Sequence, residues 1–347
     1  MSYIQDCKME PVLVINDEKK TPKYLQVVNA VLTAISRGKL NRGDQILSIN
    51  ELSDEFFFAR DTVQKAYGIL TRQGVISSVR GKGYYITRTD LITPFRILLI
   101  FNKISNYKKE VYNSFLQTMG EKATVDLKIH HFNTRIFESL IINHLTEYDY
   151  FVIMPHFYEN YEEVQKTILK IPDSKLVILD KDIPYRYTKY AAVYQDFRTD
   201  VLHALEECIE QLKKYDKLLF VQPKVIPHPP EIVTGFIYFC KQYRFEYEII
   251  HEVENPRNLK RKEAYLVIEE TDLVNLINSS KSYNYTLGKD IGIISFNDTP
   301  IKAVLENGIT VISTDHSKMG ETAARLILEN RREKIKNPFR LILRKSL

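Results

Sequence analysis

Residues 48–87 read SINELSDEFFFARDTVQKAYGILTRQGVISSVRGKGYYIT, and this stretch decides the fold of the N-terminal part of the chain. Ser48, followed by Glu51 three residues later, predicts a short capped helix. A second helix is expected from near Ala59 to Gly74, because apolar residues recur at helical spacing between Val63 and Leu70. The sequence therefore predicts two consecutive helices joined by a short turn.

Two short apolar runs, 75–79 and 84–87, follow these helices. They flank Arg80-Gly81-Lys82-Gly83, whose two glycines suit a tight turn, so we expect a β-hairpin with a basic tip. From Phe57 to Arg88 there are six cations and one carboxylate, a net charge of +5, which equals the net charge of the whole chain. A local basic face of this kind suits a polyanion.

A further amphipathic helix is expected from Pro22 to Arg37, which completes the pattern of a winged helix-turn-helix. Such a module places the start of its recognition helix in the major groove, where arginine reads guanine and glutamine reads adenine. We expect Asp61 to contact DNA or simply to complement the helix N-terminus. Tyr67 and Phe56–Phe58 are compatible with stacking on bases, but they are expected in the core. The candidate DNA-binding residues are Ser48, Asn50, Arg60, Asp61, Thr62, Gln64, Lys65, Arg80, Gly81 and Lys82.

Residues 22–87 resemble the DNA-binding domain of the gluconate-repressor (GntR) family of transcription regulators. The resemblance implies that Arg60 and Thr62 read DNA and that the basic tip grips a groove. Two positions depart from the family: Leu47 replaces its usual proline, and Asn50 replaces an arginine that contacts DNA. The operator is therefore expected to differ from the common one. The matching residues are Pro22, Tyr24, Ile35, Gly38, Leu40, Gly43, Ser48, Glu51, Leu52, Arg60, Thr62, Val63, Ala66, Leu70, Gly74, Ile76, Gly81, Gly83 and Ile86.

Length and composition limit what else the chain contains. Its 347 residues fit two or three domains. The three cysteines are isolated and the eight histidines lack metal-ligand spacing, so we expect reduced thiols, no metal and no cofactor. The N-terminal 20 residues, expected to form a loose arm, lack the pattern of a signal peptide, and no apolar run is long enough to span a membrane. We therefore expect a cytoplasmic protein.

The pattern of apolar and polar residues changes after Pro94. We expect a DNA-binding domain over residues 1–87, a linker over 88–94 and a second domain over 95–347. In the last of these, apolar runs of strand length alternate with amphipathic stretches, which is typical of parallel sheets covered on both faces. We expect an α/β fold with two doubly wound lobes. The runs are 96–101, 127–132, 150–154, 175–179, 217–221, 246–251, 264–268, 291–295 and 310–313.

Ligands of open α/β sheets bind beyond the carboxyl ends of the strands, so residues that follow the runs are candidates for effector binding. Amides, carboxylates, a lysine and rings at these places suit a polyol. Asp196 and Asp298 are equally compatible with loop caps, His156 with a hydrogen-bonded loop residue, and Lys181 with a surface ion pair. His130 and His131 are expected on opposite faces of a strand and form a poor metal pair. The candidates are Asn102, Ser105, Tyr107, His156, Phe157, Lys181, Asp196, Asp272, Asn297 and Asp298.

Residues 95–347 resemble the effector domain of lactose-repressor-type regulators, which is itself similar to periplasmic sugar-binding proteins. The resemblance is sharpest at 290–299, at 308–310 with 320–326, and at 343–346, which looks like the family's final strand; Thr234-Gly235-Phe236 also matches. It implies a sugar between two lobes, and the arabinose-repressor-like arrangement favours a pentose or a deoxyhexose. Ile232 replaces a ligand-binding arginine and Asn297 a ligand aspartate, so the identity of the sugar does not transfer.

Three other classes are weighed. An enzyme-derived second domain is disfavoured because GxSxG, GxGxxG and phosphate-binding glycine loops are missing. A plain solute-binding protein would need export, and an all-helical sensor of acids conflicts with nine strand runs. A regulator that senses a metabolite other than a sugar stays open. We expect a homodimer on a two-fold-related operator, since one winged module buries little surface. Repression relieved by the ligand is expected.

Overall fold

The computed structural model describes residue 13 and residues 22–36, 38–89, 94–157, 161–183, 189–223, 228–254 and 258–347. The chain divides into two compact units, Met1–Pro94 and Phe95–Leu347. Most of the expected N-terminal arm, Cys7, Arg37 and residues 90–93 of the expected linker lie outside the described residues.

The first unit consists of three helices and a small antiparallel sheet with strand order β1-β3-β2. β2 and β3 form the expected hairpin, and β1 adds a two-residue strand that the sequence did not reveal. Helix α1 packs on α3, so that Val27, Val31, Val63 and Leu70 are fully buried. The elements are α1 (Lys23–Ser36), β1 (Gln45–Ile46), α2 (Ile49–Phe56), α3 (Arg60–Arg72), β2 (Ile76–Val79) and β3 (Gly83–Ile86).

One expectation about this core is wrong. Tyr67 and Phe58 are buried as expected, and Phe56 is half-buried, but the ring of Phe57 is 91% exposed. Phe57 ends α2 in the left-handed conformation, with φ 53° and ψ 39°. This turn of the backbone sends the middle ring of the Phe56–Phe58 run away from the core.

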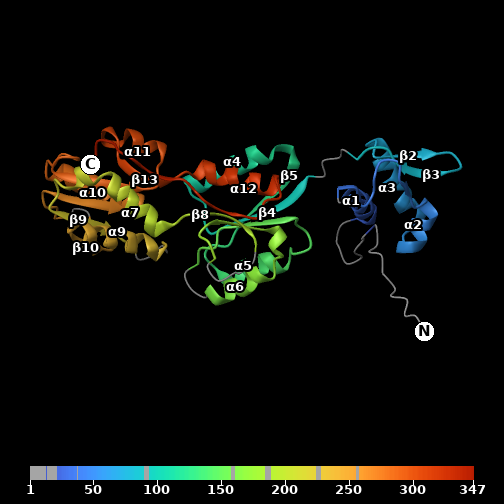
Figure 1. The fold of residues 1–347 in the computed structure, drawn as a ribbon, viewed down its shortest axis with the longest axis horizontal. Coiled ribbons are helices and arrows are strands. Elements are labelled where there is room, and N and C mark those ends of the chain that lie inside the picture. Colours follow the sequence, from blue (N-terminus) through green and yellow to red (C-terminus); the bar gives the residue numbers. More distant parts are fainter. Residues whose placement is uncertain are drawn as a thin grey trace. The chain divides into compact units, whose positions relative to one another are not determined.

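The second unit contains two six-stranded sheets, one in each lobe. The first-lobe sheet has the strand order β14-β8-β7-β6-β4-β5 and is parallel throughout. Helices α4 and α12 pack together on one face, and α5 and α6 cover the other (Figure 1). The elements are β4 (Phe95–Phe101), α4 (Asn106–Met119), β5 (Ala123–Ile129), α5 (Thr134–Ile142), β6 (Tyr150–Ile153), α6 (Tyr161–Leu169), β7 (Leu176–Asp180), β8 (Ala191–Tyr194), α12 (His316–Leu328) and β14 (Lys334–Lys336).

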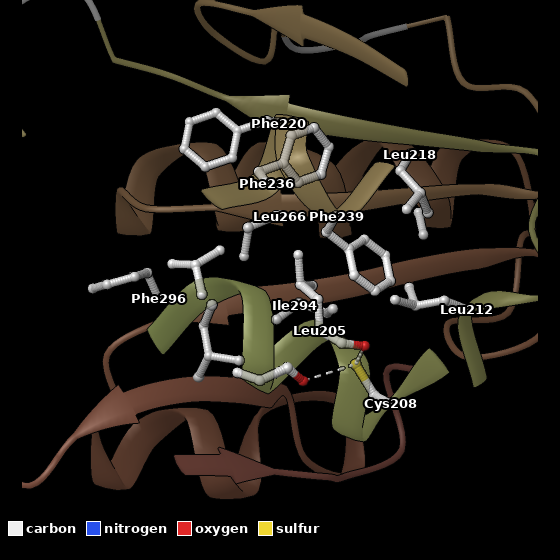
Figure 2. Packing of buried hydrophobic residues seen from close by; sticks show 14 of the residues in the cluster. Leu205, Cys208, Leu212, Leu218, Phe220, Phe236, Phe239, Leu266, Ile294 and Phe296 are labelled. Carbon is white, nitrogen blue, oxygen red and sulfur yellow. Dashed lines mark hydrogen bonds between the residues drawn. The ribbon is translucent and has the colours of Figure 1, made fainter. Parts of the chain in front are cut away.

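The second-lobe sheet has the strand order β10-β9-β11-β12-β13-β15, and only β15 runs antiparallel to its neighbour. Figure 2 shows the core on one face, where the rings of Phe220 and Phe236 lie 5.4 Å apart and the Cys208 thiol donates to the Ala204 carbonyl at 3.4 Å. The elements are α7 (Phe197–Glu207), α8 (Ile209–Leu212), β9 (Lys217–Val221), α9 (Pro230–Tyr243), β10 (Glu246–Ile250), β11 (Glu263–Val267), α10 (Glu270–Ser282), β12 (Ile291–Phe296), α11 (Pro300–Val304), β13 (Thr310–Thr314) and β15 (Phe339–Ile342).

The chain crosses between the lobes three times: from β8 to α7, from β13 to α12 and from β14 to β15. Asn337, which is buried, forms hydrogen bonds that link these three connecting segments. Its backbone N–H donates to the Tyr194 carbonyl at 2.7 Å, and its side-chain amide donates to Thr314 Oγ1 at 2.7 Å. The three segments that connect the lobes are therefore linked to one another by hydrogen bonds.

The expected α/β fold with two doubly wound lobes and a winged helix-turn-helix is confirmed. Three details are wrong. β5 ends at Ile129, and His131 and Phe132 have positive φ in the turn that follows, so His130 and His131 do not lie on a strand. The last strand is Phe339–Ile342, not 343–346, where Ser346 instead hydrogen-bonds to Ile293 and Thr310. The strands β8 and β14 were not foreseen.

Candidate functional site

The start of α2 in the first unit is fixed by a reciprocal cap. Ser48 Oγ accepts from the Glu51 N–H at 3.3 Å, and Glu51 accepts from the Ser48 N–H at 2.7 Å. The backbone hydrogen bond from Ser48 lowers the pKa of Glu51. The hydroxyl of Ser48 is therefore already engaged, whereas Asn50 is exposed.

Helix α3 presents one buried and one exposed face. Its buried face is held by Tyr67, whose hydroxyl donates to the Leu47 carbonyl at 2.5 Å. At its start, Ala59 supplies no side-chain cap. Thr62 is half-buried, and Lys65 lies 4.0 Å from the centre of the Tyr24 ring. The exposed candidates on this helix are Arg60, Asp61, Gln64 and Lys65.

The basic tip of the hairpin is an exposed turn. Gly81 and Gly83 have φ of 75° and 102°, a region that favours glycine. The carbonyl of Lys82 accepts from Gln45 Nε2 at 2.8 Å, which ties the tip to β1. The side chains of Arg80 and Lys82 are left in solvent. The first unit therefore carries a helix N-terminus and a wing that both expose cations.

The second unit holds a cavity between its two lobes that is partly open to solvent. It lies beyond the carboxyl ends of first-lobe strands and is closed by second-lobe residues near the start of α9 and the end of β12. Four predicted residues line it: Asn102, Tyr107, His156 and Asn297. The other lining residues are Lys103, Lys108, Phe132, Asp180, Gln195, Phe197, His228, Pro229, Ile232, Phe296 and His316.

Three predicted effector residues outside this lining have structural contacts. The Ser105 hydroxyl accepts from the Lys108 N–H at the start of α4. Asp196 caps α7 through the Thr199 N–H, and Asp272 accepts from the Val253 N–H at 2.8 Å. The side chains of these three residues accept hydrogen bonds from backbone N–H groups at helix ends and in a loop.

The remaining three also contact other parts of the chain. The Phe157 ring stacks on His130 at 4.3 Å. Lys181 pairs with Glu231 of the second lobe at 3.5 Å, not with a neighbouring aspartate. Asp298 forms a two-pronged ion pair with Arg344 at 2.8 and 2.9 Å.

A buried polar cluster forms the first-lobe side of the cavity. Asp180 accepts from His156 Nε2 at 2.7 Å and from the Gln195 amide. Burial alone would raise the pKa of Asp180, but these hydrogen bonds and the charge of Lys108 outweigh it and hold the pKa well below its usual range. Burial lowers the pKa of Lys108 to about 8, and this ammonium contacts the Asn102 side chain.

Two side-chain oxygens at the cavity, Oε1 of Gln195 and Oδ1 of Asn297, are buried without a hydrogen-bond partner in the described part of the chain. They come from opposite lobes. Asn297 has φ 62° and is held by Lys302, whose Nζ donates to its carbonyl at 2.8 Å. Unsatisfied buried acceptors are costly, so both favour a ligand that donates hydrogen bonds.

The sequence reasoning missed several lining residues for identifiable reasons. Gln195 follows β8, which was not recognised as a strand, and His316 begins α12 directly beyond β13. Lys108 lies inside α4, so a search of strand ends passes over it. Ile232, which stands where the resembled family has a ligand-binding arginine, is buried and provides an apolar wall.

Comparison with known proteins agrees with this architecture. Residues 23–86 match the model of the gntR family of bacterial regulatory proteins. The first unit is therefore a gntR-type winged helix-turn-helix, and the chain is a DNA-binding transcription regulator. A curated relative, the arabinose metabolism transcriptional repressor of Geobacillus stearothermophilus, is 20% identical over 90% of this chain and 92% of its own length.

Solved structures show the fold of the second unit. The trehalose repressor of Escherichia coli aligns with a TM-score of 0.59 at 13% identity, covering 72% of this chain and all of the repressor chain (100%). A periplasmic binding protein/LacI transcriptional regulator of Alkaliphilus metalliredigens in complex with D-xylulofuranose aligns with a TM-score of 0.57 at 14% identity, covering 72% and 98%. The second unit thus has the LacI-type, periplasmic-binding-protein-like fold.

None of the helices in the described residues is both long and apolar enough to cross a membrane. In the same part of the chain, no three or more histidine, cysteine, aspartate or glutamate side chains form a group that could hold a metal ion.

Proposed function

We propose that this regulator is a cytoplasmic repressor of carbohydrate-utilisation genes that leaves its operator when a small sugar binds in the cavity of the second unit. The name of the arabinose repressor, which aligns over most of the chain, supports this function. So does the sugar in the solved complex of similar fold. A pentose or a deoxyhexose is the proposed effector, and the cavity is assigned to binding, not to catalysis.

The observation that carries the proposal is the pair of unpartnered amide oxygens, Gln195 Oε1 and Asn297 Oδ1, on opposite lobes. A polyol has hydroxyl donors at several places on one small frame, so it can satisfy both oxygens at once. Each oxygen left unsatisfied costs about 1–3 kcal/mol. A sugar that bridges them therefore stabilises one arrangement of the lobes over others, which is the differential affinity that a switch requires.

The other contacts follow from the chemistry of the lining. Asn102 and His156 are proposed to bind hydroxyls, together with Lys108, which the sequence did not suggest. Burial raises the pKa of Tyr107 to about 12, so its hydroxyl stays a neutral donor. The rings of Phe132 and Phe296 offer flat apolar surfaces for the C–H faces of a sugar.

The DNA-binding contacts are proposed from exposure and position. Arg60 and Gln64 of α3 are proposed to read bases, while Thr62 and the tip residues Arg80 and Lys82 are proposed to bind the backbone or a groove edge. Asn50 is available for a weaker contact than the family's arginine. A homodimer on a two-fold-related operator is proposed because a single winged module buries little DNA surface.

The test uses the full chain and two measurements. Thermal-shift titrations with pentoses, deoxyhexoses and sugar phosphates identify the effector, since saturation at about 100 times the dissociation constant adds about 2.7 kcal/mol of stability. Mobility-shift assays on duplexes selected from a randomised pool then measure release of DNA by that ligand. A stabilising amino acid or nucleotide, with every sugar inert, would replace sugar sensing by sensing of another metabolite.

A further inference from the structure

Phe57, in the turn between α2 and α3, combines an unusual backbone with an unusual exposure. Its φ of 53° and ψ of 39° lie in the left-handed region, where its N–H donates to the Ser53 carbonyl. Its side chain is 91% exposed, although Phe58 next to it is 4% exposed and anchors the turn. The turn is therefore firmly packed by Phe58, and Phe57 adds nothing to that packing.

Both features are unfavourable for this residue type. A side chain with a Cβ is strained in the left-handed region, where glycine is not. An exposed ring also gains no free energy from burial. Glycine would serve the turn better, so the fold does not explain the phenylalanine. Strained residues persist at sites where they serve binding, so we look for a binding partner of the exposed ring.

The position of Phe57 relative to α3 indicates that the partner of its ring is DNA. Phe57 precedes Arg60, the first residue of α3, by three positions. Three residues span at most about 10 Å, which is the length of about three base-pair steps at 3.4 Å each. If Arg60 reaches a base and the exposed ring of Phe57 turns toward the duplex, the ring therefore meets the same few base pairs. The surrounding module carries exposed cations, as a DNA-binding face requires.

The chemistry of the ring limits the contact. Phenylalanine neither donates nor accepts a conventional hydrogen bond, and the apolar group that the major groove offers is the C5-methyl of thymine. We propose that Phe57 is a specificity-determining DNA contact that packs on the methyl group of a thymine beside the bases reached by the start of α3. This inference rests on the proposed DNA-binding role of α3.

The experiment selects binding sites from a pool of randomised duplexes, using the full chain and its Phe57→Gly and Phe57→Asn variants. The wild type is expected to prefer thymine at one position in each half-site, and both variants to lose that preference. Replacing this thymine by deoxyuridine, which lacks the methyl group, should weaken wild-type binding about fourfold per half-site. The same replacement should not affect the variants. Tm of Phe57→Gly should equal or exceed that of the wild type, because strain is relieved.

Three outcomes overturn the inference. They are an unchanged thymine preference in both variants, equal losses of affinity on selected and random DNA, and a deoxyuridine effect that persists in Phe57→Gly. Tyr238→Ala, which truncates an exposed ring of the second unit, is the matched control and should leave site selection unchanged. Arg60→Ala tests the proposed role of α3 separately. A failure of the proposed thymine contact of Phe57 can therefore be told apart from a failure of the proposed base reading by α3.

Discussion

Nε2 of His156 donates a 2.7 Å hydrogen bond to Asp180, and both side chains line the cavity between the two lobes. Burial lowers the pKa of His156 even though the carboxylate opposes this, while the pKa of Asp180 is held low. Because an ionised carboxylate only accepts hydrogen bonds, the contact places a ring proton of His156 on Nε2. Asp180 thus lines the cavity as an acceptor that His156 and Gln195 hold in place.

The buried histidines predict that the second unit loses stability in acid. Burial lowers the pKa of His130 and of His316 to about 4, from an ordinary value of 6.5. The unfolded chain therefore binds protons that the folded chain does not, and stability falls as pH drops from 6.5 toward 4. Each group contributes a slope of at most about 1.4 kcal/mol per pH unit in that window. Urea unfolding across the window should show a smaller slope in His316→Gln; an unchanged slope would contradict the assignment.

Substitution of Lys302 should lower the affinity for the effector and leave the affinity for DNA unchanged. Its buried ammonium donates to the carbonyls of Phe296 and Asn297 at 3.0 and 2.8 Å, and burial lowers its pKa to about 8. Lys302→Met removes both hydrogen bonds and frees the loop that carries Asn297. Effector affinity should fall about tenfold, equivalent to 1.4 kcal/mol, while DNA binding without effector is retained. Lys302→Arg keeps the charge and should recover part of the loss; equal affinities in all three proteins would remove Lys302 from this role.

The sequence predicts those site residues that follow a clear apolar run, and it does not predict those that reach the cavity from elsewhere. Asn102 and Asn297 were found because each follows a continuous apolar run, and the carboxyl ends of parallel strands converge. Gln195 was missed because the run before it, Ala191–Tyr194, is short and begins with two alanines. Lys108 and His316 reach the cavity from helices, so their placement depends on how α4 and α12 pack. Phe57 was assigned to the core by its type, and only the structure shows that its ring is exposed.

Arg60→Ala should reduce specificity on DNA. If Arg60 makes a two-pronged contact with guanine, its loss removes about 1–3 kcal/mol of discrimination, equivalent to roughly 5- to 150-fold in affinity for the operator. Binding to random DNA should change much less. Fluorescence anisotropy with operator and scrambled duplexes measures both affinities. Arg72→Ala, at the exposed far end of the same helix, is the control, and equal losses on both duplexes would argue against base reading by Arg60.

Lys82→Ala should change the salt dependence of binding and leave sequence preference intact. An exposed lysine at the wing tip that neutralises one phosphate releases about one counterion, so the slope of log affinity against log salt should become shallower by about 0.9. Titrations of the operator at several salt concentrations give this slope. Lys122→Ala, an exposed lysine of the second unit, should keep the wild-type slope. A shallower slope in both variants would show that the effect is one of net charge.

Asn297→Ala should impair the response to effector and spare DNA binding. The substitution removes one of the two unpartnered oxygens at the cavity, and a hydrogen bond to a ligand contributes about 0.5–1.5 kcal/mol, equivalent to roughly 2- to 13-fold in affinity. Gln195→Ala removes the other oxygen from the opposite lobe. If one sugar bridges both, the double variant should lose less than the sum of the single losses, because either change already breaks the bridge. Calorimetric titration of the sugar into the four proteins measures this coupling, with Asn278→Ala on the exposed face of α10 as control. Additive losses would mean that the two oxygens bind the sugar independently, which would argue against a sugar that bridges the two lobes.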